Sequence, residues 1–213
     1  MKTVRIFIAD DHEIVRHGLR RLLESQPGWE ICGEAASGRE AVEKVCQAKP
    51  DVVILDFSMP ELNGAEAARR ILKGSPRTEI VILTMHDTER LLREVLQAGA
   101  RGYVLKSDAA NDLVSAVNAM LQHKRFISPG ASGAMVEGFL RGPEPEPGER
   151  LTPREREIVQ LLTEGKSNKE VAAILDISLK TVEAHRANIM HKLNLSAFSD
   201  LVHYAIRNKI VEA

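Results

Sequence analysis

The 213-residue sequence has no long apolar run, almost no net charge and only two cysteines. No segment before the acidic pair Asp10-Asp11 has the apolar length of a signal peptide or a membrane span, so we expect a cytoplasmic protein that does not enter a membrane. Cys32 and Cys46 lie in apolar surroundings without CxxC spacing. They are therefore expected to be small buried side chains and not a disulfide or a metal site.

The chain also has no large excess of charge of either sign, because its formal net charge is -1. Nucleic-acid phosphates are neutralised by Lys and Arg at the contact surface, so any such surface must be a local patch. The composition, 44% hydrophobic and 28% charged, is that of ordinary globular domains. The length suits two domains, since a domain usually holds about 100–150 residues.

Up to about residue 123, short apolar runs alternate with segments whose apolar residues recur every three or four positions. This alternation predicts buried parallel strands connected by helices. Right-handed crossovers place such helices on both faces of one open sheet, so we expect a doubly wound α/β domain with a five-stranded parallel sheet. The predicted strands are Val4–Ala9, Trp29–Glu34, Val52–Leu55, Ile80–Thr84 and Gly102–Leu105, and the helical segments are Ile14–Leu23, Ala41–Cys46, Ala65–Leu72, Leu91–Ala98 and Leu113–Leu121.

The composition changes after Ile127, where stretches rich in Pro, Gly, Ser and Glu occupy 128–133 and 141–148. Alternating Pro and Glu disfavour a helix and keep a chain extended. We predict a first domain at 1–127, a linker at 128–149 and a second domain at 150–213. The linker pattern also allows one helical turn over Met135–Leu140.

The second domain has a helical pattern throughout, which predicts a small all-α domain. Thr152, Pro153 and Glu155 form a capping-box start signal, and Ser167 and Glu170 repeat it. The remaining signals are Gly165 at the end of the first helix, a tight turn at 176–178, an inward stripe of Val182, Ile189 and Leu193 on the third helix, and a fourth helix over Ala197–Arg207.

Polar side chains lie at the carboxyl ends of four of the predicted strands. Asp10 and Asp11 follow the first, Asp56 follows the third, Thr84 ends the fourth and Lys106 follows the fifth. The carboxyl ends of parallel strands meet at one edge, where open α/β sheets bind ligands. Three carboxylates with no His or Cys at the strand ends suit a hard ion such as Mg²⁺. With a lysine and a hydroxyl nearby, the set suits phosphoryl transfer to a carboxylate, and Asp56 is the expected nucleophile.

The first domain resembles the receiver domains of two-component response regulators, which have a flavodoxin-like fold. The resemblance covers roughly residues 1–125. It rests on five segments in order: Ala9-Asp10-Asp11-His12, Leu55–Pro60, Asn63-Gly64, Thr84–His86 and Gly102–Lys106.

The receiver resemblance implies that a sensor histidine kinase transfers a phosphoryl group to Asp56. It also implies a Mg²⁺ ion held by Asp11, Asp56 and the backbone carbonyl of Ser58, with Asp10 acting through water. Surface or loop positions are favoured over metal ligation for three histidines, His12, His17 and His86.

The same resemblance implies that Lys106 pairs with the phosphoryl group and that Thr84 and Tyr103 form a switch. A half-buried strand position without a switching role remains an alternative for Tyr103. Many receivers have proline after the lysine, whereas this chain has Ser107, which leaves the local geometry open. Ser107-Asp108 is an alternative cap for the following helix.

The second domain resembles the helix-turn-helix domain of the NarL/FixJ (LuxR-type) regulators over about residues 150–210. Two helices joined by a tight turn place the second helix in the major groove of double-stranded DNA. The resemblance therefore implies a promoter operator as the partner. It rests on the segments Leu151–Glu157, Gly165–Ala172 and Ile177–Arg186.

Between Ser178 and Lys192 the third helix carries a modest basic patch, because Lys180, Arg186 and Lys192 are opposed by Glu183, and its outer arc holds Lys180, Glu183, Ala184, Ala187, Asn188 and His191. One domain is therefore expected to bind DNA weakly, and useful affinity is expected from a homodimer on a two-part site. The predicted DNA-contacting residues are Lys180, Thr181, Glu183, Ala184, Arg186, Ala187, Asn188 and Lys192.

Individual roles on this helix stay open. Glu183 either accepts from a cytosine amino group or is repelled by phosphates, and several relatives carry Lys here and at Ala187. His185 lies near the inward stripe, where packing is favoured over DNA contact. A solvated helix face is the alternative for Lys180 and Arg186.

Three functions are compatible with these motifs. The first is a transcription factor switched by phosphorylation of Asp56, which is not an enzyme beyond Mg²⁺-dependent self-phosphorylation and slow loss of its own phosphoryl group. The second is a phosphohydrolase, although Ser58 stands where aspartate-dependent phosphatases commonly place a second aspartate. The third is an interaction module that keeps the fold but not the switch.

Overall fold

The computed structural model describes residues 3–131 and 151–211. The chain divides into two compact units, Met1–Pro143 and Glu144–Ala213. The helical turn predicted at Met135–Leu140, and the predicted linker after residue 131, lie outside the described residues. Within the described residues, no helix is long and apolar enough to cross a membrane.

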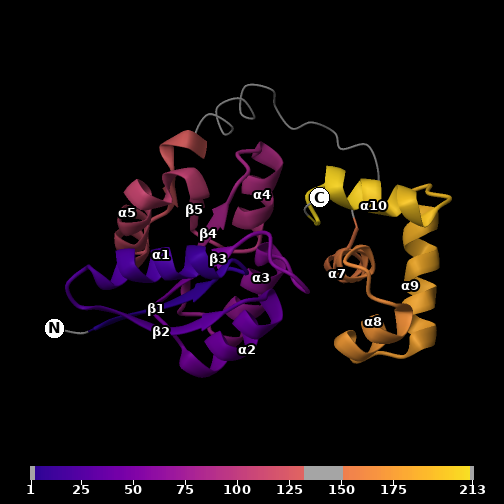
Figure 1. Ribbon diagram of the computed structural model, residues 1–213, viewed down its shortest axis with the longest axis horizontal. Helices are drawn as coiled ribbons and strands as arrows, with labels where there is room; N and C mark the ends of the chain where they lie inside the picture. Colours follow the sequence, from indigo (N-terminus) through magenta and orange to yellow (C-terminus); the bar gives the residue numbers. More distant parts are fainter. Residues whose placement is uncertain (1–2, 132–150, 212–213) are drawn as a thin grey trace. The chain divides into compact units, whose positions relative to one another are not determined.

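The first unit contains a parallel sheet with the strand order β2-β1-β3-β4-β5-β6 (Figure 1). The doubly wound parallel sheet is confirmed, and it has six strands where the sequence predicts five. The additional strand, β6, pairs Phe126 with Gly102 and Ile127 with Tyr103. The strands are β1 (Val4–Ala9), β2 (Trp29–Ala35), β3 (Val52–Asp56), β4 (Glu79–Thr84), β5 (Gly102–Leu105) and β6 (Phe126–Ile127).

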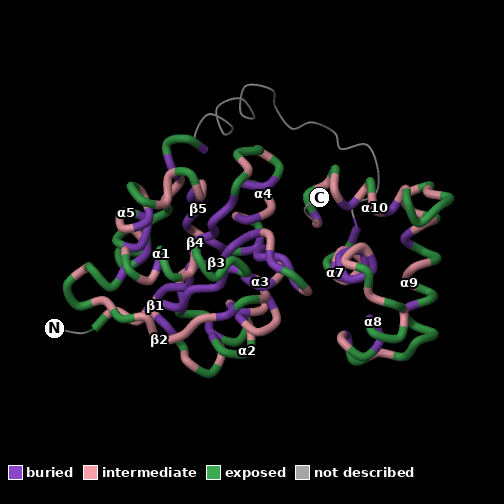
Figure 2. The backbone as a smooth tube through the Cα atoms, viewed as in Figure 1, coloured by how far each residue is buried: buried purple, intermediate pink, exposed green. Residues whose placement is uncertain are grey.

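Helices pack on both faces of this sheet. Ile6 and Phe7 are adjacent on β1 and contribute to two different buried clusters, because successive side chains of a strand point to opposite faces. One cluster receives side chains of α2 (Gly38–Ala48), α3 (Gly64–Gly74) and α4 (Glu89–Gln97). The other receives those of α1 (Glu13–Glu24) and α5 (Ala109–Leu121). The central strands are accordingly buried in Figure 2.

The first domain continues past residue 127, where the sequence places the start of the linker. Ser128 is fully buried, its amide donates to the Tyr103 carbonyl at 2.9 Å, and its hydroxyl accepts from the Leu105 amide at 3.3 Å. Ala131 is also buried, in the cluster that receives side chains of α2, α3 and α4. A Ser-Pro-Gly sequence looks like linker by composition, but Ser128 is bonded to β5 and the residues that follow it, 129–131, are helical.

The predicted cap at Ser107-Asp108 is wrong. Lys106–Asp108 forms a short 3-10 turn (η1) that leads directly into α5, and the Asp108 side chain makes no capping hydrogen bond. Asp108 has φ -101° and ψ -4°, whereas a capping residue needs an extended backbone. The Ser107 hydroxyl donates to Asp108 Oδ1 instead of to the helix backbone.

The second unit consists of α7 (Pro153–Thr163), α8 (Asn168–Leu175), α9 (Leu179–Lys192) and α10 (Phe198–Arg207). Both predicted capping boxes are present, at Thr152 with Glu155 and at Ser167 with Glu170. Asp176 adopts a left-handed conformation, which makes the tight turn between α8 and α9. Of the predicted inward stripe on α9, Val182 and Ile189 are fully buried, whereas Leu193 is partly exposed at the end of the helix.

Candidate functional site

The carboxyl ends of β1, β3 and β5 bring three charged side chains together. Asp56 is the last residue of β3, Asp10 directly follows β1, and Lys106 follows β5. Lys106 Nζ lies 2.9 Å from Asp56 Oδ2 and 2.8 Å from Asp10 Oδ2. The structure therefore brings together, at one edge of the sheet, residues that the sequence separates widely.

Asp10 and Asp56 are almost completely buried, with relative exposures of 0% and 1%. Lys106 Nζ is within hydrogen-bond distance of Oδ2 of each, and it is the one ammonium that the two carboxylates share within the described residues. One ammonium does not balance two buried carboxylates and the neighbouring Asp11. The pocket thus has the oxygen ligands and the surplus negative charge that a hard divalent cation requires.

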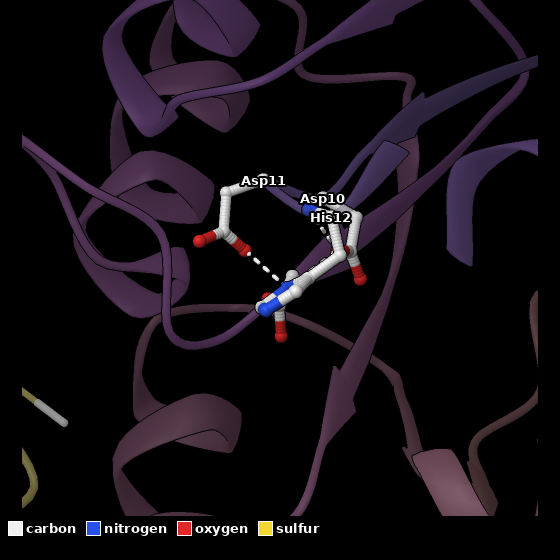
Figure 3. A group of neighbouring side chains, drawn as sticks. Asp10, Asp11 and His12 are labelled. Atoms are coloured by element: carbon white, nitrogen blue, oxygen red, sulfur yellow. Dashed lines mark hydrogen bonds and ion pairs between the residues drawn. The ribbon is translucent and has the colours of Figure 1, made fainter. Parts of the chain in front are cut away.

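Asp11 and His12 lie at the exposed mouth of the pocket (Figure 3). His12 Nδ1 is 2.8 Å from Asp11 Oδ1 and 3.4 Å from Asp10 Oδ1. One ligand atom from each of Asp10, Asp11, His12 and Asp56 lies within 4.8 Å of the others. His12 is exposed as expected, but it lies beside the acidic group, whereas His17 is exposed on α1 outside this group.

The pKa of Asp56 is raised from 3.8 to about 6, first by burial and second by the negative charge of Asp10. Lys106 and a hydrogen bond from the Ser58 backbone amide oppose this rise. Burial lowers the pKa of Lys106, but the nearby charges of Asp56 and Asp10 outweigh it, so the pKa of Lys106 is raised overall. The lysine therefore stays protonated beside a carboxyl group that ionises only near neutral pH.

The loop after β4 contacts both predicted switch residues. Thr84 Oγ1 accepts a hydrogen bond from the His86 amide at 3.1 Å, and the Tyr103 hydroxyl donates to the His86 carbonyl at 2.5 Å. Tyr103 is fully buried and not half-buried, and its switching role stays a prediction. Burial, followed by the charge of Asp87, raises the pKa of its hydroxyl. Thr84 and Tyr103 thus hold the same backbone segment at His86.

The structure of the loop between β3 and α3 shows why Asn63 is followed by Gly64 in this chain. The Asn63 side chain caps α3 by accepting from the Glu66 amide at 2.9 Å. A Cβ atom at position 64 would lie 2.4 Å from the Asp56 carbonyl oxygen, so only glycine allows α3 to begin this close to the nucleophile.

Arg16 is a pocket residue that the sequence reasoning missed. Its guanidinium donates to the Asp10 carbonyl at 2.7 Å and lies 3.6 Å from Glu34 Oε2. The side chain reaches back from α1 to hold the loop that carries Asp10 and Asp11. A single Arg on a helix gives no signal of such a contact, because the partner is a backbone atom.

In the second unit, the predicted DNA-contacting residues on α9 fall into two groups. Arg186 and Lys192 are partly buried and engaged with protein groups: Arg186 Nη1 donates to Asn168 Oδ1 at 3.4 Å, and Lys192 Nζ lies 3.2 Å from Glu155 Oε2. His185 is partly buried. The exposed residues are Lys180, Thr181, Glu183, Ala184, Ala187 and Asn188.

The fold and the acidic pocket define a response-regulator receiver, and the family comparisons agree. The family model "Response regulator receiver domain" matches residues 6–118, and the family model "Bacterial regulatory proteins, luxR family" matches residues 149–205. The chain therefore belongs to the NarL/FixJ family of two-component response regulators, with a LuxR-type helix-turn-helix DNA-binding domain.

Relatives with the same two-domain organisation cover nearly the whole chain. The chain is 41% identical to the oxygen regulatory protein NreC of Staphylococcus carnosus, over 98% of this chain and all of that protein. It is 29% identical, with a TM-score of 0.66, to RcsB of Salmonella enterica serovar Typhimurium bound to a promoter in the presence of phosphomimetic BeF3⁻, covering 95% of this chain and 98% of that one.

A two-component response regulator of the LuxR family from Aurantimonas sp. SI85-9A1 is 38% identical, with a TM-score of 0.63. It matches 65% of this chain and 99% of its own length.

Proposed function

We propose that this response regulator is a transcription factor switched by phosphorylation of Asp56, with a sensor histidine kinase as the phosphoryl donor. The observation that carries the proposal is the contact of Lys106 with both buried carboxylates, Asp56 and Asp10. A lysine in this position neutralises an oxygen of the incoming phosphoryl group while Asp56 acts as nucleophile.

In the transfer step, a carboxylate oxygen of Asp56 attacks phosphorus. The new P–O bond makes an acyl phosphate, and the P–N bond to the donor imidazole breaks, with its electron pair returning to that ring. The proton that neutralises the leaving imidazole comes from the kinase or from water. Lys106 remains protonated throughout, because the carboxylates raise its pKa.

The acidic group fits Mg²⁺ as the cofactor. Asp11, Asp56 and the Ser58 carbonyl would hold the ion, with Asp10 acting through water. When bound, the ion supplies positive charge to the phosphoryl oxygens. Two buried carboxylates that share a single ammonium, with Asp11 beside them, support this assignment.

The switch that we propose runs through the loop at His86. In the structure without a phosphoryl group, the Thr84 hydroxyl accepts a hydrogen bond from the His86 amide. A phosphoryl group on Asp56 offers that hydroxyl a new acceptor. Turning Thr84 frees that amide, and Tyr103 is bonded to the carbonyl of the same residue. The two states then differ in the surface of α4 and α5, which alters homodimerisation.

A dimer then presents two copies of α9 to the two halves of a promoter operator. Lys180 and the other exposed residues of α9 face the DNA. The supporting observation from relatives is that RcsB has been solved bound to a promoter. Pairing matters because the exposed basic charge of one α9 helix is small.

The experiment is footprinting of the full chain with and without Mg²⁺ and a small phosphoryl donor such as acetyl phosphate, with mass analysis of Asp56 in the same samples. We expect a mass increase of one phosphoryl group at Asp56 and stronger protection of the same sites. Asp56→Asn is the matched control and should show neither change. Equal protection and equal mass in both samples would refute the proposal.

The two alternatives give different results. A phosphohydrolase would release many equivalents of phosphate per chain from small phosphoesters, whereas a response regulator releases only its own phosphoryl group. An interaction module would regulate and dimerise equally as the parent and as Asp56→Asn. The Ser at position 58 and the complete pocket argue against both.

A further inference from the structure

Arg186 differs from the exposed bases of the recognition helix α9. Its side chain is partly buried, whereas Lys180 on the same helix is exposed. Its guanidinium donates to Asn168 Oδ1 at 3.4 Å and lies over the Phe198 ring, 5.4 Å from the ring centre. A guanidinium at this distance from an aromatic ring is attracted to its face.

The two partners of Arg186 are the first residues of two other helices. Asn168 begins α8, directly after its cap Ser167, and Phe198 begins α10. One side chain of α9 therefore joins the N-termini of both neighbours. The same residues line a groove of about 530 Å³, together with Lys166, Lys169 and Glu183.

We propose that Arg186 is a positioning residue for DNA recognition and not a phosphate contact. It holds the N-terminus of α8, which carries the exposed Lys169, in fixed register with the base-facing side of α9. Phosphate contacts fix the position of a protein along DNA, and base contacts read the sequence. A protein whose position is poorly fixed therefore distinguishes less well between its specific sequence and others. This inference rests on the proposed DNA-binding function.

Arginine suits this role because of its shape. The planar guanidinium stacks on a ring and donates within its own plane at the same time, whereas a lysine ammonium has no such plane. Arg186→Lys therefore keeps the charge and loses the double contact. A phosphate contact would tolerate that change.

Salt dependence separates the two roles. Each phosphate contact contributes about 0.9 to the slope of log affinity against log salt concentration. The test uses the full phosphorylated chain with two duplexes, one enriched from a random pool by the parent protein and one of scrambled sequence. The variants are Arg186→Gln, Arg186→Lys, Phe198→Ala and the exposed control Lys180→Ala.

We expect Arg186→Gln and Arg186→Lys to lower the ratio of specific to scrambled affinity by about tenfold, a loss comparable to one mismatched base pair, with the parental salt slope. Phe198→Ala, which removes no charge, should lower the ratio similarly. Combining it with Arg186→Gln should add little, because Arg186→Gln already removes the contact with the Phe198 ring. Lys180→Ala should instead flatten the slope by about 0.9 on both duplexes.

A flatter slope in Arg186→Gln that Arg186→Lys restores would overturn the inference and make Arg186 a phosphate contact. A parental ratio in both Arg186 variants would also overturn it. Melting curves identify any variant that fails to fold, and Phe198→Leu then replaces the larger truncation. A parent protein that enriches no duplex would refute the proposed function itself, an outcome distinct from altered variants of a discriminating parent.

Discussion

Lys106 Nζ lies 2.9 Å from Asp56 Oδ2 although the two residues belong to different strand ends of the sheet. The same ammonium is 2.8 Å from Asp10 Oδ2, so one cation holds two buried carboxylates that would otherwise repel each other. Without a further cation, repulsion between the carboxylates therefore lowers the free energy of unfolding, and this effect can be measured.

Asp56→Asn should stabilise the metal-free protein at pH 7.5. Folding raises the pKa of Asp56 from 3.8 to about 6, so its contribution to stability is fully present below pH 3.8 and is lost as the pH rises through about 6. The loss at neutral pH is at most about 3 kcal/mol, from the size of the shift. Urea unfolding in EDTA measures it. A variant no more stable than the parent at pH 7.5, or equally stabilised at pH 3.5, contradicts this expectation.

Removing the lysine should have the opposite effect. Lys106→Met leaves two buried carboxylates without their cation, which should lower the free energy of unfolding by about 3 kcal/mol at pH 7.5. The loss should shrink near pH 4.5, where Asp56 is protonated, and in the double variant with Asp56→Asn. Chemical denaturation at both pH values tests this, with exposed Lys44→Met as the control. A loss that is independent of pH would show that packing, not charge, is responsible.

Mg²⁺ should stabilise the parent by relieving this repulsion. At a concentration one hundred times its dissociation constant, a ligand raises the free energy of unfolding by about 2.7 kcal/mol. Thermal melting across a Mg²⁺ titration should show saturation in the parent and in Glu43→Gln, whose side chain is exposed on α2. Asp11→Asn and Asp56→Asn should show little of this shift. Equal shifts in all four proteins would place the ion elsewhere.

Tyr103→Phe should weaken the link between the pocket and the dimer. The change removes the hydrogen bond to the His86 carbonyl and costs about 1 kcal/mol of stability, while the ring stays buried. Sedimentation with and without a phosphoryl donor should show a smaller gain in dimer than in the parent. Tyr204→Phe is the matched control, because that hydroxyl makes no hydrogen bond within the described residues. A full gain in dimer for Tyr103→Phe would exclude Tyr103 from the switch.

The sequence predicts the pocket well and its surroundings poorly. Asp10, Asp56 and Lys106 were predictable as neighbours because parallel strands end at one edge, which is a property of topology. Arg16 was not, because its partner is a backbone carbonyl and carries no residue signature. Strand β6 was missed because two residues are too few for a periodic pattern.

The recognition helix shows the same limit for long side chains. Helical periodicity places Arg186 and Lys192 beside the inward stripe of Val182 and Ile189, but it does not show that their charged groups reach Asn168 and Glu155. Periodicity fixes where a Cα atom lies and leaves the position of a distant guanidinium undetermined.

Ser128 fixes the segment that follows β6 to the neighbouring strand β5. Both its amide and its hydroxyl are bonded to β5, the strand that contains Tyr103 and leads into Lys106. The end of the sheet is thus hydrogen-bonded to the strand that carries Tyr103 and leads into Lys106. A displacement of β5 is therefore transmitted directly to Ser128 and to the buried Ala131 that follows it.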